Sequence, residues 1–204
     1  MANVKHIIGE FMRIYTTAAL LSAIATSSHA EMARYELDTT HTATFFTIEH
    51  IGFSKTLGIF TEVTGSFMYD SETQELGDVQ VSINADSVDT FDDARDGHVK
   101  NKDFLDVKNH PEITFVADSG NPESANSGTV TGDLTILGQT HPVTLNVNLN
   151  KAEEYPFGHK RFVLGLSIDT TINRSDFGMS YGVANGLVGD AVDIKIETEA
   201  MKIE

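Results

Sequence analysis

Six histidines follow residue 30 of the 204-residue sequence, and the imidazole nitrogen is a common protein ligand for zinc. No two of them have the spacing of a helix-borne zinc pair, and the sequence contains no His-Glu-x-x-His motif. Cysteine is absent, so the chain offers neither a thiolate ligand nor a thiolate nucleophile. Two or three of the histidines could still meet in space, but we expect no metal site and neutral structural roles for this set: His41, His50, His98, His110, His141 and His159.

The acidic stretch TFDDARDGHVKNKDFL, residues 90–105, is the second place where chemistry could occur. Counted from Asp92, it has Asp, Asp, Gly and Asp at positions 1, 5, 6 and 12 of an EF-hand calcium loop. Position 3 is Ala94 and position 12 is a short Asp instead of the bidentate Glu, so we expect no calcium site. Hydrolytic chemistry has no better support, because the sequence lacks a Gly-x-Ser-x-Gly motif and its adjacent acids make a poor glycosidase pair.

The stretch TFFTIEHIGF, residues 44–53, places a histidine on the apolar face of an alternating strand, since Phe46, Ile48 and His50 share one parity. Two roles are open for His50. Its ring could contact a polar group of a bound molecule, or it could bond a buried backbone carbonyl near the end of the strand. Gly52 then marks a bend in the strand or a close approach of another backbone.

Alternation of polar and apolar residues predicts strands along nearly all of the chain after Ala33. Clusters of Gly, Asn, Asp and Ser separate the alternating runs and favour hairpin-like turns. We therefore expect an all-β fold, in which one antiparallel meander curls into a barrel or folds into a sandwich. The nine predicted strands are 34–38, 42–50, 64–70, 79–88, 112–118, 128–137, 142–150, 161–172 and 191–204.

The acidic stretch breaks this pattern and predicts one short helix over about residues 91–105. Thr90 and Asp93 have capping-box spacing, while Gly97 weakens the helix by about 1 kcal/mol. One face of the helix could lie over the end of a barrel. The residues of that face are Phe91, Ala94, His98 and Leu105.

The apolar residues of one strand face are numerous enough to form the interior of a closed sheet. Eight strands at the usual tilt leave an interior that side chains fill or that holds one small ligand, and composition does not separate these cases. An outer-membrane barrel is disfavoured, because the final strand places charges on its outer face. The predicted inner residues are Phe46, Ile48, Phe67, Tyr69, Val81, Ile83, Ile113, Phe115, Leu134, Ile136, Leu145, Val147, Ile194 and Ile196.

The N-terminal segment has the three parts of a secretory signal: a basic Arg13, an apolar run over residues 14–25 and a small-x-small site ending at Ala30. The apolar run is shorter than the about 20 residues that a membrane-spanning helix needs. We therefore predict a signal peptide in residues 1–30 and a single domain in residues 31–204. Met12 is a more natural start than Met1, because an acidic residue lies between them, ahead of the apolar run.

The charge of the chain limits its partners. Without the signal peptide, 12 basic and 29 acidic residues give a net charge of −17. Such a surface repels nucleic acids and anionic lipid headgroups, so we expect neither as a partner and no stable insertion into a membrane. Because the chain has no cysteine, its stability must come from core burial alone, although export would permit disulfides.

Several longer stretches make the sequence resemble the YceI-like family, secreted bacterial polyisoprenoid-binding proteins with a lipocalin-like barrel. The resemblance runs from YELDTTHT to the final strand, and the glycine-rich segment 179–189 could form a different loop. It implies an antiparallel eight-stranded lipocalin-like barrel that is closed at one end and holds the chain of an isoprenoid lipid or quinone. The stretches are FTIEHIGFSKTLGIFTEVTGSF, SVDTFDDARDGHVKNKDFLD, HPEITF, VTGDLTILGQTHPVTL and SDFG.

Binding of such a lipid is energetically reasonable. At about 0.8 kcal/mol per buried CH₂, about 12 buried carbons contribute about 10 kcal/mol, which exceeds an association cost of at least about 4 kcal/mol. No catalytic group and no cofactor is needed for this function. The residues expected to line the channel and contact the ligand are Phe46, Ile48, His50, Phe60, Phe67, Tyr69, Phe104, Leu105, Phe115, Arg174 and Phe177.

The head group of the ligand is less constrained by the sequence. A diphosphate would need cationic donors at the mouth of the channel, and the candidates are Arg95, Lys100, Lys160, Arg161 and Arg174. Arg174 matches an arginine position of the family but could instead form a structural pair with Asp176. The net charge of −17 favours a neutral head group, such as a quinone or a fatty amide.

The leading hypothesis is therefore a periplasmic protein that transports, stores or sequesters an isoprenoid-type lipid. An enzyme that acts on this lipid, with His50 or His98 as the acid–base residue, is the alternative from another class. An interaction module with a filled core is the third. Oligomeric state stays open, because the edge strands or the channel mouth could pair two copies into a homodimer.

Overall fold

The computed structural model describes residues 32–203, so the predicted signal peptide, residues 1–30, lies outside the described residues. Within that range, one antiparallel sheet contains eleven strands, accompanied by one α-helix and two 3₁₀ helices. The helices are η1 (Ala85–Ser87), α1 (Asp93–Val99) and η2 (Arg174–Phe177). The strands are β1 (Ala33–His50), β2 (Ser54–Phe60), β3 (Val63–Tyr69), β4 (Leu76–Asn84), β5 (Val88–Asp89), β6 (Glu112–Ala117), β7 (Asn121–Pro122), β8 (Ser127–Ile136), β9 (Gln139–Glu154), β10 (Phe162–Asn173) and β11 (Val188–Lys202).

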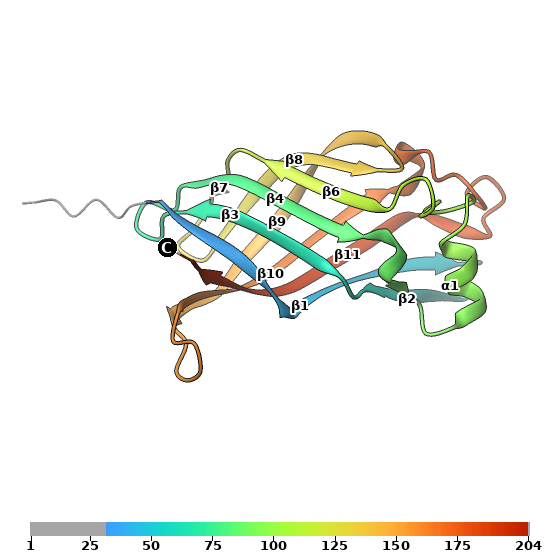
Figure 1. Ribbon diagram of the computed structural model, residues 1–204. Coiled ribbons are helices and arrows are strands. Elements are labelled where there is room, and N and C mark those ends of the chain that lie inside the picture. The colour runs from blue at the N-terminus through green and yellow to red at the C-terminus, as the bar shows by residue number, and fades with distance from the viewer. Residues whose placement is uncertain (1–31, 204) are drawn as a thin grey trace, which may run out of the picture.

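Eight of these strands close into a barrel, because β11 pairs with β10 on one side and with β1 on the other. The order around the barrel is β1, β3, β4, β6, β8, β9, β10, β11 and back to β1. Figure 1 shows the barrel from the side, with α1 at one end, called the α1 end below, and the C-terminus at the opposite end. The predicted all-β fold and eight-stranded antiparallel barrel are confirmed, and β2, β5 and β7 pair outside the circuit.

β1 contains a large bulge, at which one of its two partner strands changes from β3 to β2. Its register with β11 jumps from the pair Leu37–Ala200 to the pair Thr42–Thr198, so residues 38–41 face a single residue of β11. Before the bulge β1 also pairs with β3, and after it β1 also pairs with β2. The strands predicted for 34–38 and 42–50 are therefore one strand. β2 was not predicted, because Gly58 interrupts its short alternating run.

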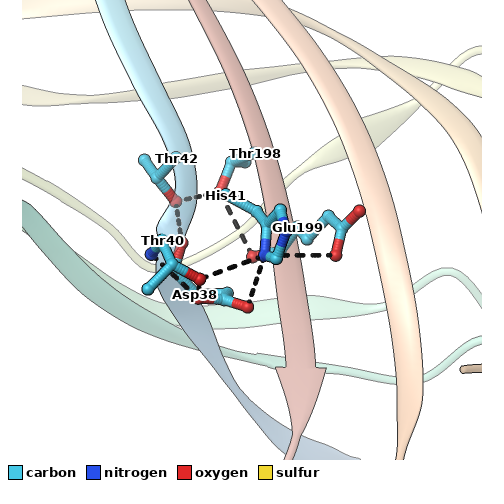
Figure 2. A network of polar contacts seen from close by, with 6 residues as sticks. All are labelled: Asp38, Thr40, His41, Thr42, Thr198 and Glu199. Atoms are coloured by element: carbon cyan, nitrogen blue, oxygen red, sulfur yellow. Dashed lines mark hydrogen bonds and ion pairs between the residues drawn. The ribbon is translucent and has the colours of Figure 1, made fainter. Parts of the chain in front are cut away.

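Hydrogen bonds of side chains hold this bulge in place, as Figure 2 shows. Asp38 Oδ1 accepts hydrogen bonds from the backbone N–H and the hydroxyl of Thr40 at 2.9 and 2.7 Å, and Asp38 Oδ2 lies 2.8 Å from His41 Nδ1. The Thr42 hydroxyl donates to the Asp38 carbonyl oxygen at 2.7 Å and lies 2.7 Å from the Thr198 hydroxyl on β11. These contacts satisfy polar groups that the interrupted ladder leaves without strand partners.

The helix begins later than predicted. The N-cap of α1 (Asp93–Val99) is Asp92, whose side chain accepts a hydrogen bond from the Arg95 N–H at 2.9 Å. Thr90, the predicted cap, is buried, and its N–H and hydroxyl both donate to Asp96 Oδ1 at 2.7 and 2.5 Å. Its side chain is thus committed to a different contact, and the capping-box prediction was wrong.

The helix also ends earlier than predicted. Gly97 lowers the helical propensity of its second turn, and the Asn101 side chain accepts the Asp103 N–H at 2.8 Å in a turn that competes with the helix. The face predicted to cover the barrel is correct for Ala94, His98 and Leu105, which face the interior, whereas Phe91 is 64% exposed. Within residues 32–203, no helix has the length and hydropathy that a bilayer span requires.

Two clusters of buried side chains pack inside the barrel. In the first, Tyr35 stacks on Phe67 with ring centroids 5.5 Å apart and nearly parallel planes, next to Leu164 and other residues of the surrounding strands. The second cluster joins Leu105 after α1 to Phe177 of η2 and to strand residues around them. These clusters bury aromatic and aliphatic surface without filling the whole interior, as described below.

The contact between Asp38 and His41 makes the stability of the bulge depend on pH. Partial burial raises the pKa of Asp38, but hydrogen bonds from His41 and Thr40 outweigh burial and hold this pKa at about 2. The hydrogen bond to Asp38 raises the pKa of His41, a slight desolvation lowers it, and the charge of Glu199 raises it further. A raised histidine pKa stabilises the fold below the unfolded value of 6.5, and this stabilisation is lost as pH rises through the folded-state pKa.

We expect His41→Gln to remove this part of the pH dependence. Between about pH 5.5 and about pH 8.5 the wild type should lose more stability than the variant, because only the wild type gives up a protonated, paired imidazole. Urea unfolding at both pH values measures the difference. Asp38→Asn removes the partner and should flatten the dependence in the same way. Parallel pH profiles for the three proteins would contradict the assignment.

Candidate ligand-binding cavity

A cavity of about 760 Å³ runs inside the barrel and is lined by side chains of all eight barrel strands. The inward residues of β9 illustrate its nature: Val143, Leu145, Val147 and Leu149 are partly buried, and the residues between them are exposed on the outer face. Inward side chains of a filled core would be fully buried, so their residual exposure comes from an open interior. The volume is in the range of small-molecule sites in proteins. The interior is therefore hollow and mainly apolar.

The sequence-predicted residues are found in the wall of this cavity. All fourteen residues predicted for the inner strand face line it. The remaining members of the predicted ligand-binding set also line it, namely His50, Phe60, Phe104, Leu105, Arg174 and Phe177. The structure thus brings the whole predicted set around one space. Whether each residue contacts a ligand stays a prediction.

Phe46 and Phe60 form an aromatic part of the wall near the α1 end, with ring centroids 5.7 Å apart. Phe46 on β1 is paired with Gly58 on β2. A Cβ atom at Gly58 would lie 2.3 Å from the Phe46 ring, so only glycine leaves room for the ring in this position. Gly58 therefore fixes how Phe46 enters the cavity.

His50 lies at the end of β1, and its side chain is exposed at the α1 end of the cavity. Its ring forms no hydrogen bond with any residue that the structure describes, so the predicted alternative of a bond to a buried carbonyl is not formed. Gly52 follows in a tight turn, in which Ile51 and Gly52 have φ values of 52° and 71° and the Phe53 N–H donates to the His50 carbonyl oxygen at 3.0 Å. The turn, not a strand bend, explains this glycine.

Arg174 is 2% exposed, and its guanidinium group binds the loop that follows it. Nε donates to the Gly189 carbonyl oxygen at 2.7 Å, and Nη1 donates to that of Met179 at 2.8 Å. Nη2 donates to the carbonyl oxygens of Tyr181 and Val188 at 2.7 and 3.1 Å. Burial lowers the pKa of Arg174, and the charge of a nearby aspartate, Asp190, partly offsets this effect.

The predicted alternative, an ion pair between Arg174 and Asp176, is therefore not formed. Arg174 donates to backbone carbonyls instead. The Arg174 guanidinium carbon also lies 5.6 Å from the centroid of the Phe104 ring, which is a cation–π distance. Arg174 thus holds the glycine-rich segment 179–189 against the barrel. Four of its five N–H groups thus donate to backbone carbonyls.

The other candidate cations are either paired or remote. Arg95 lines the α1 end of the cavity, where its Nε donates to the Thr90 hydroxyl at 2.8 Å and its Nη2 to the Thr90 carbonyl oxygen at 2.6 Å. Lys100 lies 3.2 Å from the Asp86 carboxylate. Residues 160–161 belong to the connection between β9 and β10, and they are not among the residues that line the described cavity. A charged head group would have to compete with existing contacts.

Three of the cavity residues that sequence reasoning missed bear on the chemistry of the site. Thr44 is 3% exposed, lines the cavity and has a hydroxyl without a hydrogen-bond partner among the described residues. Its shared parity with Phe46 was a usable signal for its inward position. Tyr181 and Leu187 line the α1 end from the glycine-rich segment, which has no periodicity and gave no signal.

One group of described side chains could hold a metal ion. The donor atoms of Asp38, His41 and Glu199 lie within 4.8 Å of one another at the bulge of β1. Thr198 lines the cavity, so the adjacent Glu199 points to the other face of β11. Since Asp38 and His41 already bond each other and the His41 side chain is 51% exposed, we assign the group a structural role.

His98 has a more enclosed environment inside the α1 end. Its Nε2 lies 3.3 Å from an Asp103 carboxylate oxygen, and its ring meets those of Phe104 and Tyr181 edge to face, at centroid distances of 5.0 and 5.2 Å. The aromatic neighbours restrict the ring, and the carboxylate can orient one of its nitrogens. Of the two histidines considered for acid–base chemistry, only His98 has such a partner among the described residues.

Comparison with known proteins agrees with the fold. The family model described as the YceI-like domain matches residues 35–200. A UPF0312 protein of Pseudomonas putida strain W619 is 32% identical over 192 residues, which make up 93% of this chain and 97% of the relative.

Two solved structures extend this comparison. The crystal structure of BcnA from Burkholderia cenocepacia superposes with a TM-score of 0.72 and 26% identity, over 81% of this chain and 99% of BcnA. A polyisoprenoid binding domain from Saccharophagus degradans, implicated in plant cell wall breakdown, has a TM-score of 0.61 and covers 85% of this chain and all of its own. With 15% identity, this second likeness concerns the fold alone.

The geometry of Arg174 predicts that its shape matters more than its charge. Arg174→Lys keeps the charge, but one ammonium group cannot reach carbonyls that three separate nitrogens bind now. We expect a loss of about 2–4 kcal/mol in the free energy of unfolding, together with faster hydrogen exchange in residues 179–189. Denaturant unfolding and hydrogen-exchange mass spectrometry measure these effects.

Arg95→Lys is the matched control, because Arg95 also lines the cavity but is exposed and binds only Thr90. It should cost less than about 1 kcal/mol. If Arg174→Lys unfolded no more easily than Arg95→Lys, the hydrogen bonds from Arg174 to the backbone carbonyls would not stabilise the fold.

Proposed function

The chain belongs to the YceI-like family, and from this premise we propose that it binds an isoprenoid-type amphiphile in its barrel. The observation that carries the proposal is the apolar cavity of about 760 Å³ inside the barrel. A filled interior would have left an interaction module as the better hypothesis. The name of the Saccharophagus degradans neighbour, a polyisoprenoid binding domain, is consistent with this ligand class.

Apolar contact supplies the affinity in this proposal. A chain of isoprene units meets the side chains of Phe46, Ile48 and Phe115 and of the other inward strand residues. Each buried CH₂ contributes about 0.8 kcal/mol, so affinity grows with the length of tail that fits. Aromatic rings such as Phe46 and Phe60 offer flat surfaces to the double bonds of the guest.

A neutral head group fits the polar groups of the wall better than a diphosphate. The two arginines that line the cavity, Arg95 and Arg174, already donate to protein acceptors. A diphosphate at Arg174 would compete with four backbone carbonyls, and at Arg95 it would compete with Thr90 or use N–H groups that no described residue accepts. A quinone or amide needs only one or two neutral contacts.

The signal peptide predicted for residues 1–30 makes the periplasm the proposed location. There the protein would carry, store or sequester its lipid in an aqueous compartment. The apolar cavity supports all three roles, because each requires that an insoluble tail be removed from water. No catalytic step is part of this proposal.

An enzyme acting on the bound lipid is the second candidate, and one contact favours it. His98 lines the cavity, and its Nε2 lies 3.3 Å from an Asp103 carboxylate oxygen, a contact that can orient the imidazole for acid–base chemistry. Under this hypothesis His98→Gln would leave bound lipid unchanged in amount but would abolish its chemical conversion. A carrier releases the same molecule that it bound.

Native mass spectrometry and organic extraction of the purified protein test the proposed function. We expect one lipid molecule per chain. The double variant Leu145→Trp/Val147→Trp places two bulky rings in the cavity from β9 and should weaken binding of a fluorescent isoprenoid probe about tenfold or more.

The matched control is Asn146→Trp/Asn148→Trp, which places the same rings on the outer face of β9. It should bind the probe as the wild type does. Equal probe binding by both double variants would place the ligand outside the barrel, and a chemically altered lipid in the extract would favour the enzyme.

A further inference from the structure

Thr44 is an unusual residue in the wall of the cavity. It is 3% exposed, and its Oγ1 atom is buried without a hydrogen-bond partner among the described residues, so a guest reaches this atom when the side chain turns about χ1. Thr198 and Thr170, two other threonines of the wall, have hydrogen-bonded hydroxyl groups. The Thr198 hydroxyl lies 2.7 Å from that of Thr42, and the Thr170 hydroxyl donates to the Thr144 carbonyl oxygen at 2.8 Å.

The position of Thr44 places this hydroxyl deep in the barrel. Thr44 pairs with Ile196 on β11 and with Phe60 on β2, so apolar side chains flank it on both sides. His50, at the α1 end, is six residues further along β1, which corresponds to about 20 Å of strand. A ligand atom that meets Thr44 is therefore an interior atom and not one held at the mouth.

A hydrocarbon guest and an oxygen-bearing guest differ in what they do to this group. Hydrocarbon packed against Thr44 leaves a buried hydroxyl without a partner, which is unfavourable. A carbonyl oxygen accepts its proton, and a hydroxyl can either donate or accept. The wall thus discriminates in favour of a guest that carries an oxygen at this depth.

We propose that the Thr44 hydroxyl is the polar contact for a neutral oxygen-bearing group, of the quinone, amide or alcohol class, which the ligand buries inside the barrel. This inference rests on the proposed function and narrows its ligand class. It also gives a direction to the bound molecule, because the oxygen lies inside and part of the tail extends away from it along the apolar wall.

The test compares two probes that differ in oxygen content. Ubiquinone-2 carries carbonyl groups on an isoprenoid tail, and squalene is an isoprenoid hydrocarbon without oxygen. Competition against a fluorescent apolar dye gives the affinity for each. Thr44→Val removes the hydroxyl at nearly constant volume, so it should weaken ubiquinone-2 about three- to tenfold and leave squalene equal or tighter.

Thr198→Val is the matched control, because Thr198 is also buried and lines the cavity but its hydroxyl is already bonded. It should not change the ratio of the two affinities. An unchanged ratio in Thr44→Val would overturn the inference while leaving the lipid-binding function intact. Failure of both probes to bind the wild type would instead overturn the proposed function.

A second observation concerns the α1 end, where large apolar side chains stand in water. Ile51, Tyr181 and Leu187 line the cavity there and are 45%, 43% and 40% exposed, and the neighbouring Phe53 is 90% exposed. These four residues are called the apolar rim. The Ile51 N–H donates to the Leu187 carbonyl oxygen at 3.2 Å, and the Tyr181 ring packs on His98 of α1.

The opposite end of the cavity has a different character. Its exposed lining residues come from the β7 region and are small or polar, namely Asn121, Pro122, Ala125 and Asn126. At the α1 end the exposed lining contains the apolar side chains of the rim beside the polar Glu49, His50 and Arg95, whereas at the opposite end it contains no large apolar side chain among the described residues. The apolar wall is thus continuous with the outer surface at one end.

The backbone conformation at Ile51 disfavours isoleucine, so the turn itself does not explain this residue. Ile51 and Gly52 both have positive φ, the geometry of a type I′ turn, which strongly favours Asn at the first position. A β-branched residue in this region is strained. Ile51 therefore gives up local stability and exposes an apolar side chain beside the cavity.

We infer that the apolar rim docks on the surface of a zwitterionic lipid bilayer, so that the tail passes between membrane and barrel without crossing water. This inference also rests on the proposed function. The net charge of the chain opposes anionic lipids, and the rim provides the apolar contact that a neutral surface requires.

Sedimentation with phosphatidylcholine vesicles tests the rim. Ile51→Asn/Phe53→Ser should reduce bound protein about fivefold or more, because two apolar side chains no longer reach the acyl region. The variant should fold at least as well as the wild type, since Asn suits the backbone at position 51. Phe157→Ser, which removes a 66% exposed ring from the connection between β9 and β10, should bind like the wild type.

Light scattering and native mass spectrometry of the same samples separate the outcomes. A wild type that holds lipid but ignores vesicles would overturn docking alone, and one that holds no lipid would overturn the proposed function. A wild-type dimer that Ile51→Asn/Phe53→Ser converts to a monomer would show that the rim pairs two copies, which also overturns docking.

Discussion

The pairing of β1 with β11 is the constraint on which the rest of the structure depends, since without it the sheet has two free edges and no enclosed interior. Closure lets the barrel keep its shape through its strand ladders although its inward side chains leave about 760 Å³ unfilled. Such a hollow forfeits dispersion contacts along its wall. The stacked Tyr35 and Phe67, and the cluster around Leu105 and Phe177, provide dense packing around the part that stays open.

The bulge of β1 links closure to the chemistry of the wall. By facing four residues against one, it lets the first half of β1 pair with β3 and the second half with β2 while both halves keep β11. The Thr42 and Thr198 hydroxyls bond each other at this irregularity, and Thr44 follows as a buried residue with a free hydroxyl. The feature that shapes the barrel therefore also brings a polar group into an otherwise apolar wall.

The sequence predicted the strands, whose polar and apolar residues alternate, and missed contacts made by segments without such a period. Alternation identified the inner face, from Phe46 and Ile48 to Ile194 and Ile196, because inward and outward residues of a strand must differ when one side is apolar. It did not show that the interior is hollow, which depends on how far apart the walls stand. The limits of α1 were wrong because Thr90 bonds Asp96 and leaves the cap to Asp92. Arg174 was correctly placed at the cavity, but its contacts with four carbonyls depend on an aperiodic loop.

The charges in the cavity wall and the charge of the outer surface favour the same class of ligand. Inside, Arg174 donates to four backbone carbonyls and Arg95 to Thr90, and among the described residues the buried side-chain polar atom without a partner is the neutral hydroxyl of Thr44. Outside, the chain after residue 30 has a net charge of −17, which opposes anionic headgroups, and the apolar rim at the α1 end leaves apolar contact as the available attraction. A neutral amphiphile satisfies both conditions, because its oxygen meets a hydroxyl and its tail meets apolar side chains from the interior to the rim. A diphosphate fits less well, since its charge would face the net negative charge of the chain and the buried Arg174 already donates to four carbonyls.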